Sequence, residues 1–299
     1  MLDSNTKNKN FNLFKDVYFS ESDDFKTNLL PYWIKKFSSL IAREQSGKIP
    51  RYYAEFSQGT LVMVDFGVRI GGEISGGHFG VVLNKNDTKY ERNIIVVPLT
   101  SKKKSRYIPL DYEVMEECSK LLFNRSESCL KKIEILEDEK EKFINEFNTS
   151  NKHFSFNTET ETTIFRECGI ENSSSFTIEL STDPNSNNEF RQNLNKLKNH
   201  KNFSQAQNVK SFVETSEIFL NSTERINQKM TSLVSEIEQF KTLEKRMERY
   251  TKSTYADVNN ITTVSKLRAK KISEYTISGN ISLSETSIDK LKNKLSSII

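Results

Sequence analysis

Three short apolar runs between residues 60 and 99 have the length and composition of β-strands. The runs cover residues 60–66, 79–83 and 93–99, are rich in β-branched and other apolar residues, and are bounded by turn-forming residues. Seven of the ten glycines of the chain fall within residues 59–80, around the first two runs. Short strands with glycine-rich connections predict a small β-barrel.

Before these runs, apolar residues recur at the spacing of one face of a helix. They are Leu30, Trp33, Ile34, Phe37, Leu40 and Ile41. The pattern predicts an amphipathic helix over about residues 24–45, ended by Gly47 and Pro50, whose apolar face packs on the barrel.

A much longer helical pattern follows the strands. Residues 189–278 contain neither glycine nor proline, and apolar residues recur there in alternating steps of three and four. The seam consists of Val209, Phe212, Phe219, Ile226, Met230, Leu233, Ile237, Phe240 and Met247, with Thr223 and Glu244 at its polar positions. It predicts a heptad-like helix of about 60 Å. Because residues 111–147 also favour a helix, an antiparallel hairpin within the chain is the economical arrangement, and pairing between chains is the alternative.

The pattern returns to strands near the end of the sequence. Residues 255–265 are strand-like at both ends, and Ser282 to Glu285 resemble a capping box before a terminal helix. We therefore predict an α+β fold, with one small barrel interrupted by a helical hairpin or coiled-coil insertion and closing near residue 265. The expected divisions are an N-terminal extension with the amphipathic helix (1–56), the first part of the barrel (57–110), a mostly helical insertion (111–252), and the last barrel strand with a C-terminal helix (253–299).

Composition limits the class of protein. Apolar residues make up only 35% of the 299 positions and charged residues 28%, so part of the chain is expected to be solvated helix or loop. No apolar run approaches the ~20 residues of a membrane span, and no apolar signal segment opens the sequence. Three cysteines without paired spacing argue against a disulfide scaffold. We expect a cytoplasmic protein with no membrane partner.

Basic residues gather in two places, although the net charge of +4 is mild. The first cluster is Lys102, Lys103, Lys104 and Arg106, and the second is Lys266, Arg268, Lys270 and Lys271. Two such clusters can hold a phosphate backbone, and two solvated faces are the alternative.

Metal and nucleotide chemistry are disfavoured. The only histidines, His78, His153 and His200, have no neighbours at the spacing of metal ligands. The glycine-rich segment links strand to strand and lacks the Gly-x-x-x-x-Gly-Lys-Ser/Thr pattern that cradles nucleotide phosphates. We expect no metal site and no cofactor.

Two strand ends carry candidate chemistry. His78 stands where the glycine-rich segment enters the second strand, and a histidine there can transfer protons near neutral pH. A turn histidine that binds a backbone carbonyl is the alternative. Thr100 and Ser101 end the third strand and present two hydroxyls beside the first basic cluster, with capping of the strand end as the alternative.

Four segments, taken in order, resemble the MazF/PemK toxin family. They are residues 59–67, 72–84, 95–102 and 257–268. The resemblance covers residues 57–106 and 254–299, under half of the chain. It implies an SH3-like barrel, a homodimer, metal-independent cleavage of single-stranded RNA, and a cognate protein antitoxin whose extended tail lies across the dimer.

Within this resemblance, Thr100 falls on the family's catalytic threonine. His78 falls where most members carry a catalytic arginine, five residues after the loop glutamate, here Glu73. Phe79 replaces the usual proline. A histidine at this position can act as general acid or base, so another cation must cover the phosphate.

The resemblance implies the following roles. His78 transfers a proton as the ribose 2′-OH attacks the adjacent phosphorus, and Thr100 or Ser101 donates a hydrogen bond to a non-bridging oxygen. The products are a 2′,3′-cyclic phosphate and a 5′-OH. Lys102 and Lys103 hold the RNA backbone, with Arg69 as a further candidate cation. The remaining RNA-binding candidates are Glu73 and the 68–77 loop, the aromatic residues Phe66 and Phe79, and the basic residues Lys266 and Arg268.

Two other functions remain open. The first is a gyrase-inhibiting toxin on the same barrel, of the CcdB type, which needs neither His78 nor Thr100. The second is a non-catalytic module that binds nucleic acid or a partner and assembles through the long helices. For the insertion, the alternatives are a longer RNA groove, an antitoxin-docking site, a trigger sensor, or a tolerated elaboration without a function.

Overall fold

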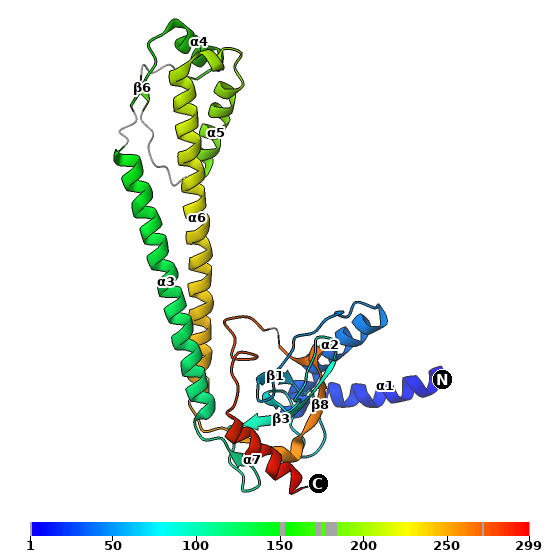
Figure 1. The fold of residues 1–299 in the computed structure, drawn as a ribbon. Coiled ribbons are helices and arrows are strands. Elements are labelled where there is room, and N and C mark those ends of the chain that lie inside the picture. The colour runs from blue at the N-terminus through cyan, green and yellow to red at the C-terminus, as the bar shows by residue number, and fades with distance from the viewer. Residues whose placement is uncertain (1, 150–152, 171–174, 177–183, 271, 299) are drawn as a thin grey trace. The chain divides into compact units, whose positions relative to one another are not determined.

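The computed structural model describes residues 2–149, 153–170, 175–176, 184–270 and 272–298 (Figure 1). The chain divides into two compact units. The first unit joins Met1–Ser126 to Gln239–Ile299, and the second is Glu127–Glu238. The first unit is therefore discontinuous in sequence, and each unit is described by itself.

The first unit contains a six-stranded antiparallel sheet. Its strands are β1 (Leu61–Asp65), β2 (Gly77–Val82), β3 (Asn93–Thr100), β4 (Ile108–Pro109), β7 (Tyr255–Ala256) and β8 (Thr262–Ser265). The order is β1-β2-β3-β7-β4, and β8 also pairs with β3. The strands predicted from the apolar runs are confirmed, including the two short strands at the ends of residues 255–265.

Closure of this sheet into a barrel is not confirmed, because the assigned strands do not form a ring. The outer edge of β1 is instead lined by residues 269–270 and 278–283. Lys270 N–H donates to the Met63 oxygen, Gly279 N–H donates to the Leu61 oxygen, and Leu61 N–H donates to the Ile281 oxygen. These bonds satisfy the edge of β1 without a regular strand opposite it.

Both faces of the sheet are buried. Alternate residues of each strand point to opposite sides, and the residues on each side enter a separate hydrophobic core. Leu61, Val81, Val97 and Leu99 enter one core, which also receives side chains from the long helices and the C-terminal helix. The neighbouring residues on the same strands enter the other core, and these are Val62, Val64, Val82, Ile94 and Val96. Strands buried on both sides explain why the sequence shows continuous apolar runs instead of alternation.

The helices wholly inside the first unit are α1 (Ser4–Tyr18), α2 (Phe25–Gln45) and α7 (Glu285–Ser296), with three-residue 3-10 helices η2 (Glu248–Tyr250), η3 (Val258–Asn260) and η4 (Lys266–Arg268). The predicted helix at 24–45 is confirmed as α2, and the Asp24 carboxylate caps its N-terminus. The predicted cap at Ser282 is wrong. Ser284 caps α7 by accepting from Ser287 N–H, because Ser282 still pairs with Thr60 beside β1.

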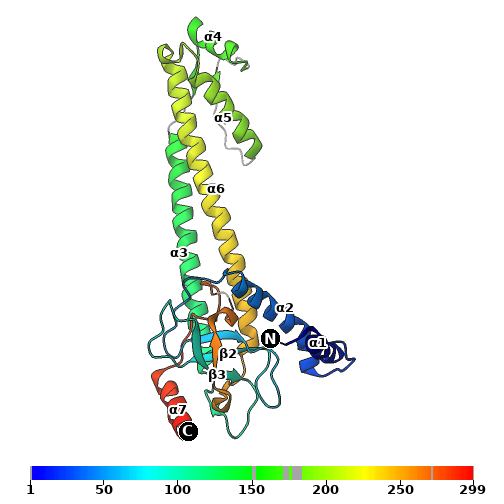
Figure 2. The same cartoon turned by 90° about the vertical axis from the view of Figure 1, so that its right-hand side faces the viewer.

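Two long helices, α3 (Glu113–Thr149) and α6 (Gln207–Met247), carry the chain into the second unit and back. Figures 1 and 2 show them side by side. Lys132 pairs with Glu236, and Lys229 pairs with Glu139, with Nζ and Oε1 2.6 Å apart in the second pair. Seven positions forward on α3 thus correspond to seven positions backward on α6. The two helices pair in antiparallel fashion within one chain.

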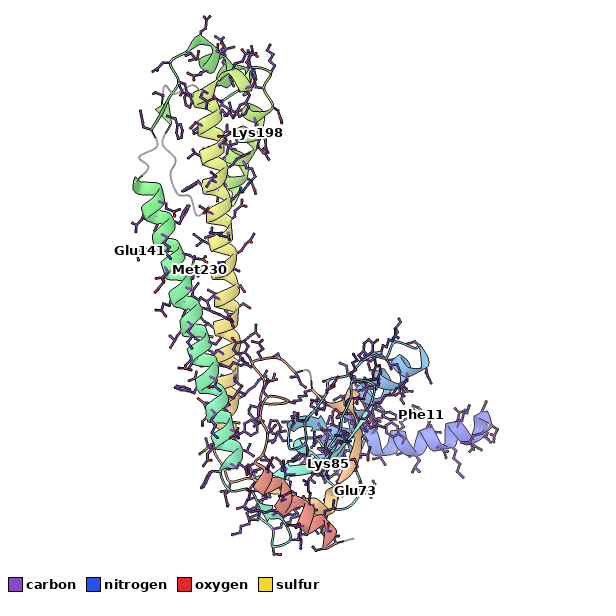
Figure 3. All side chains as sticks on the ribbon, viewed as in Figure 1. Phe11, Glu73, Lys85, Glu141, Lys198 and Met230 are labelled. Atoms are coloured by element: carbon purple, nitrogen blue, oxygen red, sulfur yellow. The ribbon has the colours of Figure 1, made fainter. Side chains whose placement is uncertain are left out.

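The second unit also contains α4 (Glu159–Glu167), α5 (Pro184–Lys198), η1 (Phe203–Gln205), and the two-residue strands β5 (Phe154–Ser155) and β6 (Ser175–Phe176). Its core is rich in phenylalanine, and Phe156, Phe165 and Phe212 are almost completely buried there. The first half of the predicted seam on α6 is buried, through Val209, Phe212, Phe219 and Ile226. In the second half Leu233, Ile237, Phe240 and Met247 are half-buried, Met230 is 47% exposed (Figure 3), and Glu244 is also exposed. The buried stripe near the end of α6 runs instead through Leu243.

Candidate functional site

A pocket of about 260 Å³ lies in the first unit, at the start of β2 and the end of β3. It is lined by Met63, Gly77, His78, Phe79, Leu99, Thr100, Ser101, Lys102, Val114, Tyr250, Lys252 and Thr254. Three of the residues predicted to be catalytic, His78, Thr100 and Ser101, therefore share one pocket with the predicted phosphate-binding residue Lys102.

The sheet register brings His78 and Thr100 together. Gly80 pairs with Pro98 on the adjacent strand, and continuing this antiparallel register by two residues sets His78 opposite Thr100. The Nδ1 atom of His78 lies 3.2 Å from the backbone oxygen of Leu99. A carbonyl oxygen can only accept, so Nδ1 carries the proton of this bond. In the neutral tautomer that this bond selects, Nε2 is the nitrogen without a proton.

Burial lowers the pKa of His78 below its ordinary value of 6.5, because the half-buried ring is costly to charge. Hydrogen bonds from the ring to the backbone of Leu99 and Ser75 oppose this effect, and the positive charge of Lys102 adds to it. The net result is a ring that is neutral at pH 7 and able to accept a proton at Nε2.

Thr100, Ser101 and Lys102 form a short turn at the end of β3. The Thr100 Oγ1 atom accepts a hydrogen bond of 3.1 Å from the backbone N–H of Lys102. This bond uses one lone pair of the hydroxyl and leaves its proton available to a ligand. The turn fixes Lys102 beside the pocket, where its charge acts on His78.

Three residues predicted to bind RNA, Lys103, Phe79 and Phe66, are either outside the pocket or buried. Lys103 is exposed but does not line the pocket. Phe79 lines the pocket yet is only 8% exposed, and its ring packs edge-on against Tyr250 with centroids 5.2 Å apart. Phe66 is buried in the core on the other face of the sheet. Neither phenylalanine presents an open face on which a base stacks.

Arg69, Glu73 and Arg268 belong to a second group of residues, around the loop between β1 and β2. Arg69 Nη1 lies 3.6 Å from Glu73 Oε2. Arg268 Nε donates to the Asp65 backbone oxygen, and its guanidinium lies 5.0 Å from the centre of the Trp33 ring. Burial, together with the charge of Arg69, lowers the pKa of Arg268 below its ordinary value. None of these side chains lines the pocket.

Helix α2 holds this loop in place. Trp33 packs so closely on Gly67 that a Cβ atom there would lie 2.6 Å from the indole ring. Lys36 Nζ lies 3.0 Å from Asp65 Oδ2, and Lys26 Nζ donates to the Gly71 oxygen. The packing of α2 on the sheet domain, predicted from its apolar face, therefore takes place through the glycine-rich loop.

Lys266 is an internal residue. Its Nζ atom lies 2.7 Å from Asp87 Oδ2, and the two side chains are 2% and 0% exposed. The same ammonium donates to the Thr88 oxygen and lies over the ring of Phe56. The structure does not bring Lys266 to any surface that RNA can reach. The neighbouring residue Lys271 of the second basic cluster lies outside the described residues.

A further segment that lines the pocket was not predicted from the sequence. Tyr250, Lys252 and Thr254 line the pocket and directly follow helix α6. Val114, in the first turn of α3, lines it as well. No local pattern marks Tyr250, Lys252 and Thr254, because more than a hundred residues, from the start of α3 to the end of α6, separate them in sequence from the strands that carry His78 and Thr100.

Metal ligands, thiol nucleophiles and membrane-spanning helices were also considered within the described residues. No three His, Cys, Asp or Glu side chains gather there as a metal site. Cys118 is a free thiol whose pKa burial raises to about 12, so it is not a nucleophile at neutral pH. Among the described helices, none combines the length and the apolar character that a bilayer crossing requires.

Comparison with known families supports the resemblance to the MazF/PemK toxins for one part of the chain. Residues 57–148 match the family of PemK-like, MazF-like toxins of type II toxin-antitoxin systems. The PemK-like segment begins just before β1, includes His78, Thr100 and Lys102, and ends inside α3. It does not include residues 250–254. No curated protein and no solved structure matches the chain.

Proposed function

We propose that this protein is the toxin of a type II toxin-antitoxin system and acts as a metal-independent endoribonuclease on single-stranded RNA. The observation that carries the proposal is that His78, Thr100 and Lys102, all within the PemK-like segment, line one pocket. Growth inhibition follows from cutting messenger RNA.

The reaction begins with the ribose 2′-OH. The Nε2 atom of His78 takes its proton, and the 2′-oxygen attacks the adjacent phosphorus. The bond from phosphorus to the 5′-oxygen then breaks, and a proton from solvent or from a protonated group passes to that oxygen. The products are a 2′,3′-cyclic phosphate and a 5′-OH, and DNA is not a substrate because it lacks the attacking hydroxyl.

Proton abstraction is the role that suits His78. Its Nδ1–H bond to Leu99 orients the ring and leaves Nε2 as the acceptor. The lowered pKa keeps Nε2 unprotonated at pH 7. The ring is thus prepared for the first step and returns to its neutral state after the proton is released.

Thr100 and Ser101 stabilise the phosphorane. Both hydroxyls line the pocket, and the turn that they share with Lys102 fixes their direction. Each hydroxyl donates a hydrogen bond to a non-bridging oxygen, where negative charge develops. Lys102 holds the reacting phosphate, and Lys103 contacts the RNA backbone outside the pocket.

We assign a secondary role to the loop between β1 and β2. Arg69 and Glu73 lie on it, Arg268 packs beside it, and a strand of RNA that leaves the pocket passes along this loop. Phe79 and Lys266 are left out of the proposal, because the first is buried against Tyr250 and the second is buried against Asp87.

We also propose the architecture and partners that the resemblance implies. The sheet is an SH3-like barrel built from residues 57–110 and 253–299, preceded by an extension at 1–56 and interrupted by a helical insertion at 111–252. The bonds that β1 forms with residues 269–270 and 278–283 support closure, and the discontinuous first unit supports an insertion. The toxin works in the cytoplasm as a homodimer, and a cognate antitoxin protein neutralises it.

Expression in growing cells, combined with an RNA cleavage assay in EDTA, tests this function. Wild-type protein is expected to arrest growth and to cut a mixed single-stranded RNA, whereas His78→Ala and Thr100→Ala do neither. Growth arrest that survives His78→Ala would redirect the search to a protein target such as gyrase. If wild-type protein neither arrests growth nor cleaves RNA, a non-catalytic binding module would be favoured.

A further inference from the structure

Cleavage by the 2′-OH needs more positive charge than the predicted catalytic residues supply. The phosphodiester carries one negative charge, and attack of the 2′-oxygen adds to it in the transition state. His78 is neutral when it accepts the proton, and the hydroxyls of Thr100 and Ser101 provide only dipoles. Stabilisation of this kind calls for ammonium or guanidinium groups aimed at the phosphate.

Three of the basic residues predicted to bind RNA are already engaged in contacts within the protein. Arg69 pairs with Glu73, and Arg268 is held between the Asp65 backbone and Trp33. Lys266 is buried against Asp87. These side chains would have to break existing contacts before they could reach a phosphate in the pocket.

Two lysines that line the pocket have no such engagement. Within the described part of the chain, neither the Lys102 ammonium nor the Lys252 ammonium forms an ion pair. Lys102 follows the end of β3, two residues after Thr100. Lys252 comes from the segment that follows α6.

The backbone around Lys252 is fixed at both ends. Two residues before it, the Tyr250 ring packs on Phe79. Two residues after it, Thr254 forms backbone bonds with the two residues that follow β4: its oxygen accepts from Leu110 N–H at 2.9 Å, and its N–H donates to the Asp111 oxygen at 3.0 Å. Lys252 therefore lies at the middle of a short strap whose ends are anchored to the pocket walls.

The strap is also tied to the catalytic strand. Tyr255 pairs with Thr100 in the register of β3 and β7. The strap thus leads directly into the strand that pairs with Thr100, and the exposed Lys252 side chain lines the same pocket.

We propose that Lys252 is a phosphate-binding residue of the active site, which contacts the scissile phosphate of single-stranded RNA together with Lys102. This inference rests on the proposed ribonuclease function. It makes the segment that returns from the long helices part of the catalytic site, although this segment lies outside the PemK-like match.

The first test compares cleavage by Lys252→Ala, Lys252→Arg and a matched control, Lys245→Ala. Lys245 is exposed on the last turn of α6 and does not line the pocket, so the control makes the same charge change. Loss of one charged contact to the transition state typically costs about 10²-fold in rate. We expect a loss of that order for Lys252→Ala, recovery to within about tenfold for Lys252→Arg, and no change for Lys245→Ala.

The second test measures binding without cleavage, using a single-stranded RNA oligonucleotide with 2′-O-methyl groups throughout. Fluorescence anisotropy over a salt series gives the slope of log K against log salt concentration. Removing one phosphate contact to a single strand is expected to reduce this slope by about 0.7. Lys252→Ala is expected to show this reduction, and Lys245→Ala is not.

The two tests separate the inference from the function on which it rests. If wild-type protein cleaves RNA, and Lys252→Ala cleaves and binds as well as wild type, the inference is overturned and the function stands. If wild-type protein does not cleave, and binding still depends on Lys252, the ribonuclease assignment fails and the phosphate contact stands. If wild-type protein neither cleaves nor binds the oligonucleotide, both are overturned. Thermal unfolding of each variant is the control for folding. A variant that melts at the same temperature as wild type is folded, so its loss of cleavage or binding has another cause.

Discussion

The Nδ1 atom of His78 lies 3.2 Å from the backbone oxygen of Leu99, the residue before Thr100. This bond links the two strands that carry the candidate chemistry and selects the tautomer of the ring. It makes Nε2 the only ring atom able to accept a proton, and the proposed mechanism depends on that assignment.

The pH profile of cleavage follows from the lowered pKa of His78. The ring must be neutral to act as a base, and burial places its pKa below 6.5. We therefore expect kcat/KM on a short single-stranded RNA to rise with pH through that pKa and to level off by about pH 7. Thr100→Ser is expected to keep the same profile. A rate that falls as pH rises through the same range would mean that His78 acts in its protonated form.

Removing the hydroxyl of Thr100 should reduce the rate without preventing folding. Thr100→Val keeps the shape of the side chain but loses the donor to the phosphorane and the acceptor for Lys102 N–H. Loss of one such donor costs about 10²–10³-fold in kcat. Thr100→Ser keeps both functions and should stay within about tenfold of wild type. Equal activity of Thr100→Val and wild type would remove Thr100 from the mechanism.

The contact between Trp33 and Gly67 predicts a difference between two glycine substitutions. Gly67 has a φ of 72° and Gly71 a φ of 60°, so alanine strains the backbone at either position. At Gly67 the new Cβ would also lie 2.6 Å from the indole, whereas nothing lies within 4 Å at Gly71. We expect Gly71→Ala to cost about 1–2 kcal/mol in the free energy of unfolding, and Gly67→Ala to cost at least 1 kcal/mol or so more. Urea denaturation measures both, and equal losses would show that α2 does not pack on the loop.

The buried ion pair of Lys266 and Asp87 predicts an effect on stability. Lys266→Met leaves the Asp87 carboxylate buried without its cation, which typically costs about 3–5 kcal/mol in the free energy of unfolding. The control is Lys36→Met, which removes the partly exposed partner of Asp65 and should cost less than about 1 kcal/mol. Urea denaturation of both variants checks this. Wild-type stability in Lys266→Met, combined with weaker RNA binding, would restore Lys266 to the RNA-binding surface.

Much of the fold could be predicted from local patterns. The apolar runs of β1, β2 and β3 and the helical spacing in α2, α3 and α6 are strong signals, and all six elements lie where they were predicted. Helix α1 was not predicted, because its apolar residues do not form a long buried stripe and Phe11 is 62% exposed (Figure 3). The cap of α7 was misplaced because Ser282 and Ser284 are equivalent in sequence and only the bond of Ser282 to the sheet separates them.

The site was predictable only where the sequence places residues on neighbouring strands. His78 stands at the start of one β-like run, and Thr100 and Lys102 follow the end of the next, so their meeting depends on a single strand pairing. The burial of Lys266 depends on Asp87, which is far away in sequence, and no local pattern separates a buried lysine from a solvated one. Lys252 reaches the pocket only because α3 and α6 form a hairpin within the chain and return the backbone to the sheet.

Identification of the fragment ends tests the central claim most directly. Purified protein is incubated in EDTA with a single-stranded RNA and with the same sequence as DNA, alongside His78→Ala. The account predicts cleavage of RNA alone, with 2′,3′-cyclic phosphate and 5′-OH ends, and none by His78→Ala. Fragments with 5′-phosphate ends, cleavage of DNA, or undiminished cleavage by His78→Ala would contradict it.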